Sequence, residues 1–362
     1  MLQRYPQARG AIQILSFSPR PFSAGSLVET PLGPVFVKRH HRSVRNEVGM
    51  MEEHHFLNWL SRRTNLVKAP FANENGHTVT CLAEWTYEVH PIAIGVDTYQ
   101  DALSWTPFQG THHARAAGRA LAELHLASAG YDAPSRAPGQ LISSVSILAS
   151  ENAVEGIETW LASRPQLSEY LERRRWRNAV IEWIQPTFEK LRPLVKSLPP
   201  LWTHNDLHAS NLTWSSGSSS ASVTGIIDFG LADRTNAVHD LATAIERNIV
   251  EWLRISEPGA KLVHFDHLEA LLAGYLDVRQ LSYSEAQALT AMLPIVHIEF
   301  ALSEADYFLS ILHSEEKTRI AWEGYFIDHA RWFRSPQGLN LLQFLEEWAA
   351  KHLSPQEVEA TR

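Results

Sequence analysis

The sequence predicts a two-lobed α+β protein, in which a β-rich N-terminal lobe precedes a mainly helical C-terminal lobe. Residues 1–94 hold short β-type runs around a single helical segment, whereas residues 95–362 are dominated by long helical patterns. One short β stretch, residues 211–230, interrupts the helical part. We therefore expect two domains, 1–94 and 95–362, with one β-hairpin embedded in the second.

The N-terminal lobe is expected to be a mostly antiparallel sheet. Runs rich in β-branched and aromatic residues, separated by Pro, Gly and polar turns, are typical of strands. Such runs occur in AIQILSF (11–17), in the hairpin SLVETPLGPVFVKRH (26–40), in HTVTCLAEW (77–85) and in TYEVHPIAIG (86–95). The hairpin should turn at Pro31–Pro34, where two prolines flank a glycine.

Residues 44–63 are expected to form the single helix of this lobe. At about 100° per residue, one side of that helix is apolar. The residues on this side are Val48, Met51, Phe56, Trp59 and Leu60. This stripe is predicted to face the core, with Glu52 in the middle of it and Glu53 at its edge.

The C-terminal lobe begins with an Ala-rich helical segment, THHARAAGRALAELHLASAG (111–130), and residues 150–195 and 264–352 are also helical patterns. Between them, NLTW and VTGIIDFG flank the segment SSGSSSAS. The Ser/Gly composition is typical of a linker, but the β-type flanks favour a hairpin with a loop of about eight residues over a domain boundary.

Composition excludes several classes of protein. The chain has 362 residues, 44% of them apolar, and a formal charge of −8, which argues against nucleic acid as the main partner. The single cysteine, Cys81, excludes an internal disulfide and fits a reducing compartment. The first residues, MLQRYPQARGAIQILSF, contain no apolar run long enough for a signal peptide or a membrane span. We expect a cytoplasmic protein without a membrane partner.

The stretch THNDLHASN (203–211) contains the first candidate site, His204-x-Asp206-x-x-x-x-Asn211. An Asp five residues before an Asn suits a loop in which the carboxylate accepts a proton from a hydroxyl and the amide oxygen binds Mg²⁺. A polar turn capped by Asn211 explains the same pattern about equally well when the motif is taken alone.

The second candidate is Asp228 in Ile226-Ile227-Asp228-Phe229-Gly230. Two β-branched residues lead from a strand into a carboxylate, and the glycine allows a sharp turn. A lone D-F-G is a weak signal. Here it stands on the far arm of the hairpin that follows Asp206 and Asn211, where a carboxylate could hold Mg²⁺ between two phosphates.

Lys38 is the third candidate, because it ends the apolar strand that includes Val37. A lysine in this position can pair with the α- and β-phosphates of a nucleotide if a carboxylate holds it in place. The helix at 44–63 offers Glu47, Glu52 and Glu53. The order of lysine strand, acidic helix, Asp–Asn loop and D-F-G is the order that a nucleotide phosphotransferase needs.

With these motifs the chain resembles the aminoglycoside phosphotransferase and choline kinase-like family of small-molecule kinases. The resemblance covers roughly residues 10–330 and is densest at 203–245. AGRALAELH (117–125) is similar to the helix after the hinge of that family, and Asp240 in VHDLATA to its structural aspartate. The resemblance implies a bilobal protein-kinase-like fold, and EHHFLNWLSRRTNLVKAP selects Glu53 as the partner of Lys38. HPIAIG (90–95) is similar to the hinge, which implies that Ile92 and Ala93 meet the adenine edge.

Two departures from the family pattern stand out. The usual glycine between the His and the Asp of the catalytic loop is Asn205, and the segment expected to cover the phosphates, SPRPFSAG (18–25), has one glycine. The resemblance implies ATP and Mg²⁺ as cofactors: Lys38 grips the α/β-phosphates, Asn211 and Asp228 hold the metal, and Asp206 deprotonates the acceptor hydroxyl. His204 is expected to brace the loop, and His208 to lie behind it or to face the substrate.

The acceptor is expected to be a small, amine-bearing metabolite or antibiotic with a hydroxyl group. LPIVHIEFALSEADYFLS (293–310) loosely resembles a helix of the homoserine kinase branch, but acids replace the arginines of that branch. These acids are Glu299, Glu304 and Asp306. Acids near a substrate pocket favour a cationic acceptor. Solvated faces of a long helix are the alternative explanation for them.

Three other functions compete with this interpretation. A catalytically weak pseudokinase or nucleotide-binding scaffold is suggested by Asn205. A metallohydrolase could use His204, Asp206, His208 and Asp228 as ligands, but it leaves Lys38 and Asn211 without a role. A protein kinase is disfavoured, because Asp240 and its helix follow D-F-G without an activation segment that ends in A-P-E.

Overall fold

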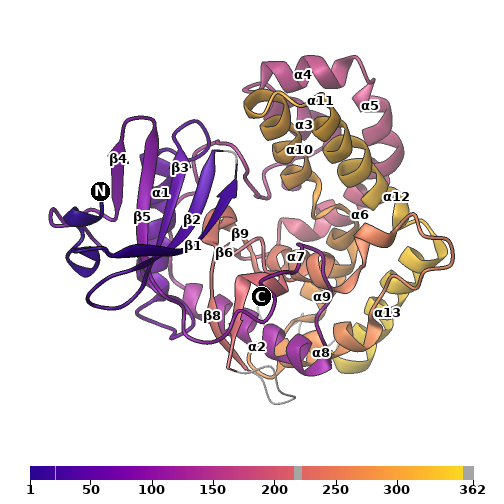
Figure 1. The fold of residues 1–362 in the computed structure, drawn as a ribbon. Helices are drawn as coiled ribbons and strands as arrows, with labels where there is room; N and C mark the ends of the chain where they lie inside the picture. Colours follow the sequence, from indigo (N-terminus) through magenta and orange to yellow (C-terminus); the bar gives the residue numbers. More distant parts are fainter. Residues whose placement is uncertain (21, 216–221, 354–362) are drawn as a thin grey trace.

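A computed structural model describes residues 1–20, 22–215 and 222–353 of the chain. It has two parts, a five-stranded antiparallel sheet on one side and a mass of helices on the other (Figure 1). The spatial order of the strands is β1-β2-β3-β5-β4. Their bounds are β1 Gln13–Arg20, β2 Ser23–Glu29, β3 Val35–His41, β4 Val79–Leu82 and β5 Trp85–Pro91. The predicted bilobal α+β fold is therefore confirmed.

Helix α1 (Glu47–Leu60) buries only part of the predicted apolar stripe. Phe56 and Leu60 are buried as predicted, but Val48 is 63% exposed and Met51 is 39% exposed. The buried residues are Met50, Glu53, His54, Phe56, Leu57 and Leu60. The prediction was wrong for Val48 and Met51 because the buried face includes two polar residues, which pair with other polar side chains of the fold instead of facing solvent.

The helical lobe is built around α2 (Thr111–Ser128) packed on α8 (Phe265–Leu276). Gly118 and Gly274 allow this close approach, because a Cβ at Gly118 would collide with Leu271 O and one at Gly274 with Arg115 O. The other helices are α3 Ala153–Leu161, α4 Pro165–Glu172, α5 Trp176–Ala179, α6 Gln185–Val195, α7 Ala237–Ile249, α9 Tyr283–Met292, α10 Ile298–Asp306, α11 Glu315–Arg319, α12 Asp328–Trp332 and α13 Pro336–His352.

Two small antiparallel sheets lie within the helical lobe. Strands β7 (Leu212–Trp214) and β8 (Val223–Ile226) form the predicted hairpin, whose tip at residues 216–221 lies outside the described residues. Strands β6 (Pro200–Thr203) and β9 (Asp233–Asn236) form a second pair that the sequence did not predict. These strands have four residues each and lack clear alternation, and they meet only because the β7–β8 hairpin returns the chain to β6.

The connection between the lobes is fixed against the β7–β8 hairpin. After β5, Val96 exchanges two backbone hydrogen bonds with Trp214, with N···O distances of 2.7 and 2.9 Å. Gly95 has a φ of +110°, and a Cβ there would collide with Thr224 Oγ1. The expected hinge at Ile92 and Ala93 therefore lies directly between the sheet and the elements that carry the candidate site.

The apolar interior forms two clusters. The smaller lies in the sheet lobe and contains Tyr5, Ala8, Val28, Val35, Val37 and Val89. The larger fills the helical lobe and also contains Phe56, Leu57 and Leu60 of α1. Helix α1 therefore belongs by sequence to the first lobe but packs its apolar residues into the core of the second.

One helical stretch, Tyr283–Ile311, is long and apolar enough to cross a membrane by length and composition, with a mean hydropathy of 1.3 over its most apolar window. However, 83% of that window is buried inside the fold. We therefore interpret it as a core segment of the helical lobe.

Candidate active site

The loop at residues 204–211 connects β6 to β7 and is fixed by His204. This side chain is fully buried, with Nε2 2.9 Å from Ile227 O and Nδ1 3.2 Å from Asp206 N. Because a carbonyl only accepts and a backbone amide only donates, Nε2 carries the proton and Nδ1 accepts. His204 therefore joins the catalytic loop to the D-F-G strand in its neutral form.

Asp240, on α7, holds the backbone of the same loop. Its carboxylate accepts from His204 N at 2.9 Å and from Asn205 N at 2.8 Å, and His125 Nε2 lies 3.1 Å away. Burial on its own would raise the pKa of Asp240, but the hydrogen bond and charge of His125 outweigh it and leave that pKa below its usual value. The structural role expected for Asp240 matches this geometry.

Asn205 occupies a backbone conformation that explains its presence. Its φ is +62°, in the left-handed region, where Asn is the commonest substitute for Gly. Its amide nitrogen donates to Ser143 O at 3.2 Å and Leu231 O at 3.1 Å, and its Oδ1 accepts from Thr203 Oγ1 at 2.8 Å. Asn205 thus keeps the turn that a glycine would form and adds hydrogen bonds across the loop.

Asp206 is paired with an arginine that the sequence interpretation missed. Arg247 Nε lies 3.1 Å from Asp206 Oδ1, and its side chain is 3% exposed. Burial would lower the pKa of Arg247, but Tyr325, Asp206 and Glu246 raise it above its usual value. Arg247 stands seven residues after Asp240, on the same face of α7, and this spacing could have indicated it.

His208 lies beside Asp206 but does not hydrogen-bond to it. Its Nε2 is 3.7 Å from Asp206 Oδ2, and its Nδ1 is 2.8 Å from Ser210 Oγ. Burial lowers the pKa of His208 despite the nearby carboxylate of Asp206. The ring is therefore held neutral next to the proposed base.

Asn211 and Asp228 lie at the same end of the β7–β8 hairpin. Ile227 N donates to Asn211 O at 2.9 Å, which fixes Asn211 beside the D-F-G strand. Asn211 Nδ2 donates to Asp206 O at 2.9 Å, so Oδ1 is the end of the amide that can bind a metal. A carboxylate and an amide oxygen are ligands that suit Mg²⁺.

Asp228 forms an ion pair with Lys38. Lys38 Nζ lies 3.1 Å from Asp228 Oδ1, and the Asp228 side chain is 49% exposed. The charge of Lys38 holds the pKa of Asp228 well below its usual range. The backbone of Asp228 is left-handed, with φ +61°, which turns the carboxylate out of the strand.

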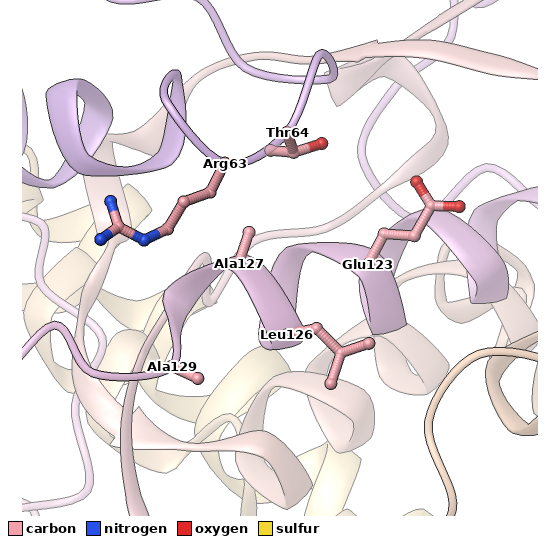
Figure 2. Close-up of a pocket in the computed structure, with 6 residues that line it drawn as sticks. All are labelled: Arg63, Thr64, Glu123, Leu126, Ala127 and Ala129. Atoms are coloured by element: carbon pink, nitrogen blue, oxygen red, sulfur yellow. The ribbon is translucent and has the colours of Figure 1, made fainter.

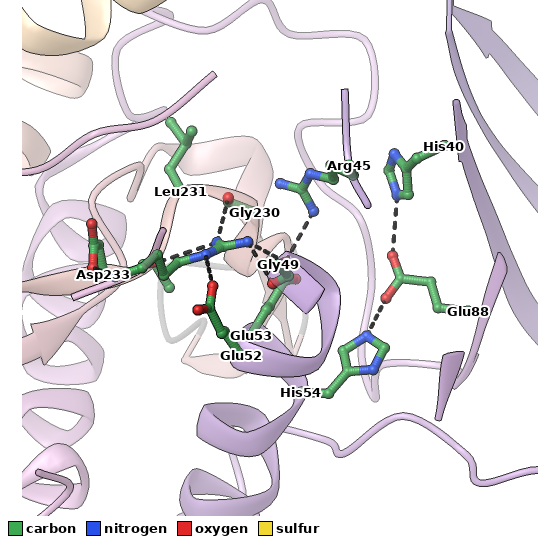
Figure 3. Close-up of polar contacts among 12 residues, drawn as sticks. His40, Arg45, Gly49, Glu52, Glu53, His54, Glu88, Gly230, Leu231 and Asp233 are labelled. Carbon is green, nitrogen blue, oxygen red and sulfur yellow. Dashed lines mark hydrogen bonds and ion pairs between the residues drawn. The ribbon is translucent and has the colours of Figure 1, made fainter. Parts of the chain in front are cut away.

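Glu53 does not pair with Lys38 as expected. Among the ion pairs of the described residues, Glu53 Oε2 contacts Arg45 Nη1 at 3.0 Å (Figure 3) and Arg136 Nη2 at 3.9 Å. Lys38 contacts Asp228 instead. Arg45, in the segment before α1, packs against the D-F-G turn, because a Cβ at Gly230 would collide with its guanidinium. The expected pairing was wrong for this structure because Arg45 occupies the carboxylate.

Arg136 connects α1 to the segment that follows D-F-G. It donates to Gly49 O at 2.8 Å, Gly230 O at 3.0 Å and Ala232 O at 3.2 Å, and its own amide donates to Asp233 Oδ1 at 2.8 Å. Burial lowers the pKa of Arg136 even though Glu53 raises it. Figure 3 shows Glu52, Glu53, Gly49 and Asp233 gathered around this contact.

The three acids expected near the acceptor differ in their surroundings. Glu299 accepts from Ser144 at 2.5 Å and Ser146 at 3.0 Å, and Asp306 accepts from Gln140 at 2.9 Å. Glu304 instead interacts electrostatically with the charges of Arg247 and Asp206. Burial raises the pKa of Glu304 to about 7, although Arg247 opposes the shift.

A surface hollow of about 340 Å³ lies elsewhere on the molecule. It is formed by the loop after α1 and the end of α2, and its lining is Arg63, Thr64, Glu123, Leu126, Ala127 and Ala129 (Figure 2). None of these residues belongs to the lysine strand, the catalytic loop or the D-F-G segment. None of the candidate site residues on β3, the 204–211 loop or the β7–β8 hairpin therefore lines this hollow.

A family model described as the phosphotransferase enzyme family matches residues 23–281. The chain belongs to this phosphotransferase family. None of the curated protein sequences compared with this phosphotransferase matches it.

Solved structures share the fold of this phosphotransferase at low sequence identity. An amicoumacin kinase in complex with AMP-PNP, Ca²⁺ and Ami has a TM-score of 0.58 and 14% identity, covering 94% of this chain and 89% of that one. An aminoglycoside phosphotransferase from Alicyclobacillus acidocaldarius has a TM-score of 0.52 and 14% identity, covering 94% of both chains. A thermostable mutant of aminoglycoside phosphotransferase APH(4)-Ia, with AMP-PNP and hygromycin B, has a TM-score of 0.53 and 13% identity, covering 89% and 94%.

Proposed function

We propose that this chain transfers the γ-phosphate of ATP to a hydroxyl group of a small, amine-bearing molecule. The observation that carries the proposal is the convergence of three segments that are far apart in sequence: Lys38, the loop with Asp206 and Asn211, and Asp228. Lys38 Nζ lies 3.1 Å from Asp228 Oδ1, and Ile227 N, next to Asp228, donates to Asn211 O at 2.9 Å. This is the set of cation, base and metal ligands that phosphoryl transfer from a nucleotide requires.

Each residue has a role that its surroundings support. Asp206 accepts the proton of the acceptor hydroxyl, while the charge of Arg247, whose Nε lies 3.1 Å from Asp206 Oδ1, stabilises the carboxylate. Lys38 leaves Asp228 and binds the α/β-phosphates. Asn211 Oδ1 and the Asp228 carboxylate would hold Mg²⁺, which supplies charge neutralisation of the phosphates when bound. The backbone at Ile92 and Ala93 receives the adenine edge.

The acceptor is proposed to carry a positive charge. Glu304 is the acid left to receive an amine, because Glu299 and Asp306 already accept hydrogen bonds within the helical lobe. With a pKa of about 7, Glu304 is close to half ionised at neutral pH. A nearby ammonium group would favour its ionised form and thereby gain affinity. Amino alcohols, hydroxy amino acids and aminoglycosides are the matching classes.

The competing functions receive less support from this geometry. A metallohydrolase needs His204 as a ligand, but both ring nitrogens of His204 are used by backbone groups. The pseudokinase interpretation relied on Asn205, which instead supports the loop through Ser143 O and Leu231 O. The presence of Asn205 in place of the usual glycine therefore removes no group that phosphoryl transfer needs.

The test is a coupled ADP-release screen of the purified full chain with ATP and Mg²⁺. Amino alcohols, hydroxy amino acids, neutral sugars and aminoglycosides serve as acceptors, and mass spectrometry detects the added phosphate. We expect turnover with at least one cationic acceptor and none in the matched Asp206→Asn variant. ADP release that is independent of every acceptor, or undiminished in Asp206→Asn, would contradict the proposal.

A further inference from the structure

A buried glutamate in the sheet lobe is surrounded by three histidines. The Glu88 side chain is 1% exposed. Its Oε2 lies 2.8 Å from His54 Nε2 and 2.7 Å from His90 Nε2, and its Oε1 lies 3.2 Å from His40 Nε2. Figure 3 shows the carboxylate between the rings of His40 and His54. All three rings present the same nitrogen to one carboxylate, although His40, His54 and His90 come from three different elements.

The register of the sheet explains this convergence. Lys38 pairs with Glu88 and Phe36 with His90 across β3 and β5, so Glu88 and His90 share one face of the sheet. His40 stands two residues beyond Lys38 and lies on the same face. Helix α1 packs on this face of the sheet and brings His54 to it. His54 is one of the two polar residues that α1 buries.

These groups match the ligand set of a transition-metal ion. One ligand atom from each of His54, Glu88 and His90 lies within 4.8 Å of the others, whereas His40 Nε2 contacts the other carboxylate oxygen, Oε1, and does not belong to this group. Two imidazole nitrogens and one carboxylate oxygen are a typical set of three protein ligands for Zn²⁺ or Co²⁺, and a water molecule then takes the fourth tetrahedral position.

The hydroxyl group of Thr78 lies next to the second ring nitrogen of His54. Its Nδ1 lies 2.8 Å from Thr78 Oγ1, which can accept the Nδ1 proton when Nε2 coordinates a metal. Histidine ligands usually donate their second nitrogen to such a partner, which fixes the tautomer and the ring orientation. The contact therefore supplies the outer hydrogen bond that a ligating His54 needs.

We propose that His54, Glu88 and His90 bind one divalent transition-metal ion, zinc by its ligand chemistry, which links α1 to β5. The ion would lie beside Lys38, the cross-strand neighbour of Glu88. It would hold α1 against β5, the neighbour of the lysine strand, through bonds stronger than the histidine–glutamate hydrogen bonds. Metal binding here uses none of the proposed catalytic residues. The metal proposal can therefore fail while the proposed phosphotransferase function holds, and the reverse is also possible.

The test titrates the chelator-treated full chain with Co²⁺ and records the visible absorption of tetrahedral cobalt. We expect one equivalent to bind, Zn²⁺ to displace it, and the melting temperature to rise with the metal. His90→Gln, whose side chain is partly exposed, should bind at least about tenfold more weakly and lose the melting shift. His54→Gln is a second ligand variant in case the first folds poorly.

Three control variants locate the ion. His55→Gln changes an exposed histidine of α1 and should leave the cobalt spectrum unchanged. Asp228→Ala removes the proposed Mg²⁺ ligand and should also leave it unchanged. His267→Gln changes the group His264, Asp266 and His267, the other such cluster among the described residues. Absence of tetrahedral cobalt, or a spectrum that persists in His90→Gln and disappears in one of these controls, would overturn the proposal.

Discussion

Lys38 and Asp228 form an ion pair at 3.1 Å although 190 residues separate them in sequence. The contact joins strand β3 of the sheet lobe directly to the D-F-G turn of the helical lobe. In the phosphoryl transfer that we propose, the two residues would have different partners: the nucleotide phosphates for Lys38 and the metal for Asp228. We interpret the pair as the arrangement that precedes nucleotide binding, in which each charge neutralises the other.

Replacement of Asp228 tests its role as a metal ligand. Asp228→Ala should abolish Mg²⁺-dependent nucleotide binding, because the ionised carboxylate is lost and Lys38 loses its partner. Isothermal titration of ATP with and without Mg²⁺ measures the effect. Asp101→Asn, at an exposed position, is the matched control. Equal Mg²⁺ dependence in Asp228→Ala and the wild type would remove Asp228 from the metal site.

Asp206 should affect chemistry and not nucleotide binding. Loss of a positioned general base typically costs about 10²–10⁴-fold in rate, and we expect Asp206→Ala to lose turnover within this range. ATP affinity should remain close to that of the wild type, since Lys38 and Asp228 are unchanged. Single-turnover kinetics and ATP titration separate the two effects. Retention of most of the turnover would show that another group accepts the proton.

Arg247 should be essential for both stability and turnover. It is buried between Asp206, at 3.1 Å, and Glu246, at 3.7 Å. Removing one partner of a buried ion pair costs about 3–5 kcal/mol, so Arg247→Met should lower the free energy of unfolding by about this amount. Urea denaturation measures the loss. In the milder variant Arg247→Lys, kcat should fall with little change in the KM for ATP, and an unchanged kcat would contradict a positioning role.

The sequence predicted the elements whose signals are local. Strand alternation located the hairpin at 26–40, and the spacing of Asp206, Asn211 and Asp228 indicated groups that the fold brings to one end of the β7–β8 hairpin. These residues could be found because chain order and short loops determine their positions. The β6–β9 pair was missed because each strand is short and gains its partner only after the hairpin has formed.

The pairing of charged side chains was harder to predict. Glu53 was expected to pair with Lys38, but the carboxylate of Glu53 pairs with Arg45 instead. Nothing in the local sequence pattern near Arg45 indicates that its side chain turns toward α1. The buried face of α1 was found only in part, at Phe56 and Leu60, because hydrophobic periodicity does not place polar residues such as Glu53 and His54 in a core. Their burial becomes favourable only through Arg45 and Glu88, which come from other segments.

The raised pKa of Glu304 predicts how pH affects an amine-bearing acceptor. As the pH rises through about 7, Glu304 loses its proton and should bind the cation more tightly, so the KM of the acceptor should fall. Glu304→Gln should remove this dependence without changing the KM for ATP. The measurement is steady-state kinetics with an acceptor whose amine stays charged throughout. The pH range runs from about 6 to about 8, one unit on each side of the Glu304 pKa of about 7.

The same group gives an opposite trend in stability. Between its unfolded pKa of about 4.3 and its folded pKa of about 7, the folded chain binds more protons at Glu304 than the unfolded chain does. The contribution of Glu304 to the free energy of unfolding therefore falls as the pH rises through this window. Glu304→Gln should flatten that part of the profile. A profile identical to the wild type would show that Glu304 is not buried beside Asp206.

Asn205 offers a test that separates backbone geometry from hydrogen bonding. Asn205→Gly keeps the left-handed turn at φ +62° but loses the contacts to Ser143 O and Leu231 O, so we expect a lower melting temperature with activity retained. Asn205→Ala loses the same hydrogen bonds and adds a left-handed penalty of about 1–2 kcal/mol. The Ala variant should therefore unfold at a lower urea concentration than the Gly variant. Equal urea midpoints for the Ala and Gly variants would mean that alanine is not strained at this position. The hydrogen bonds alone would then determine the contribution of Asn205 to stability.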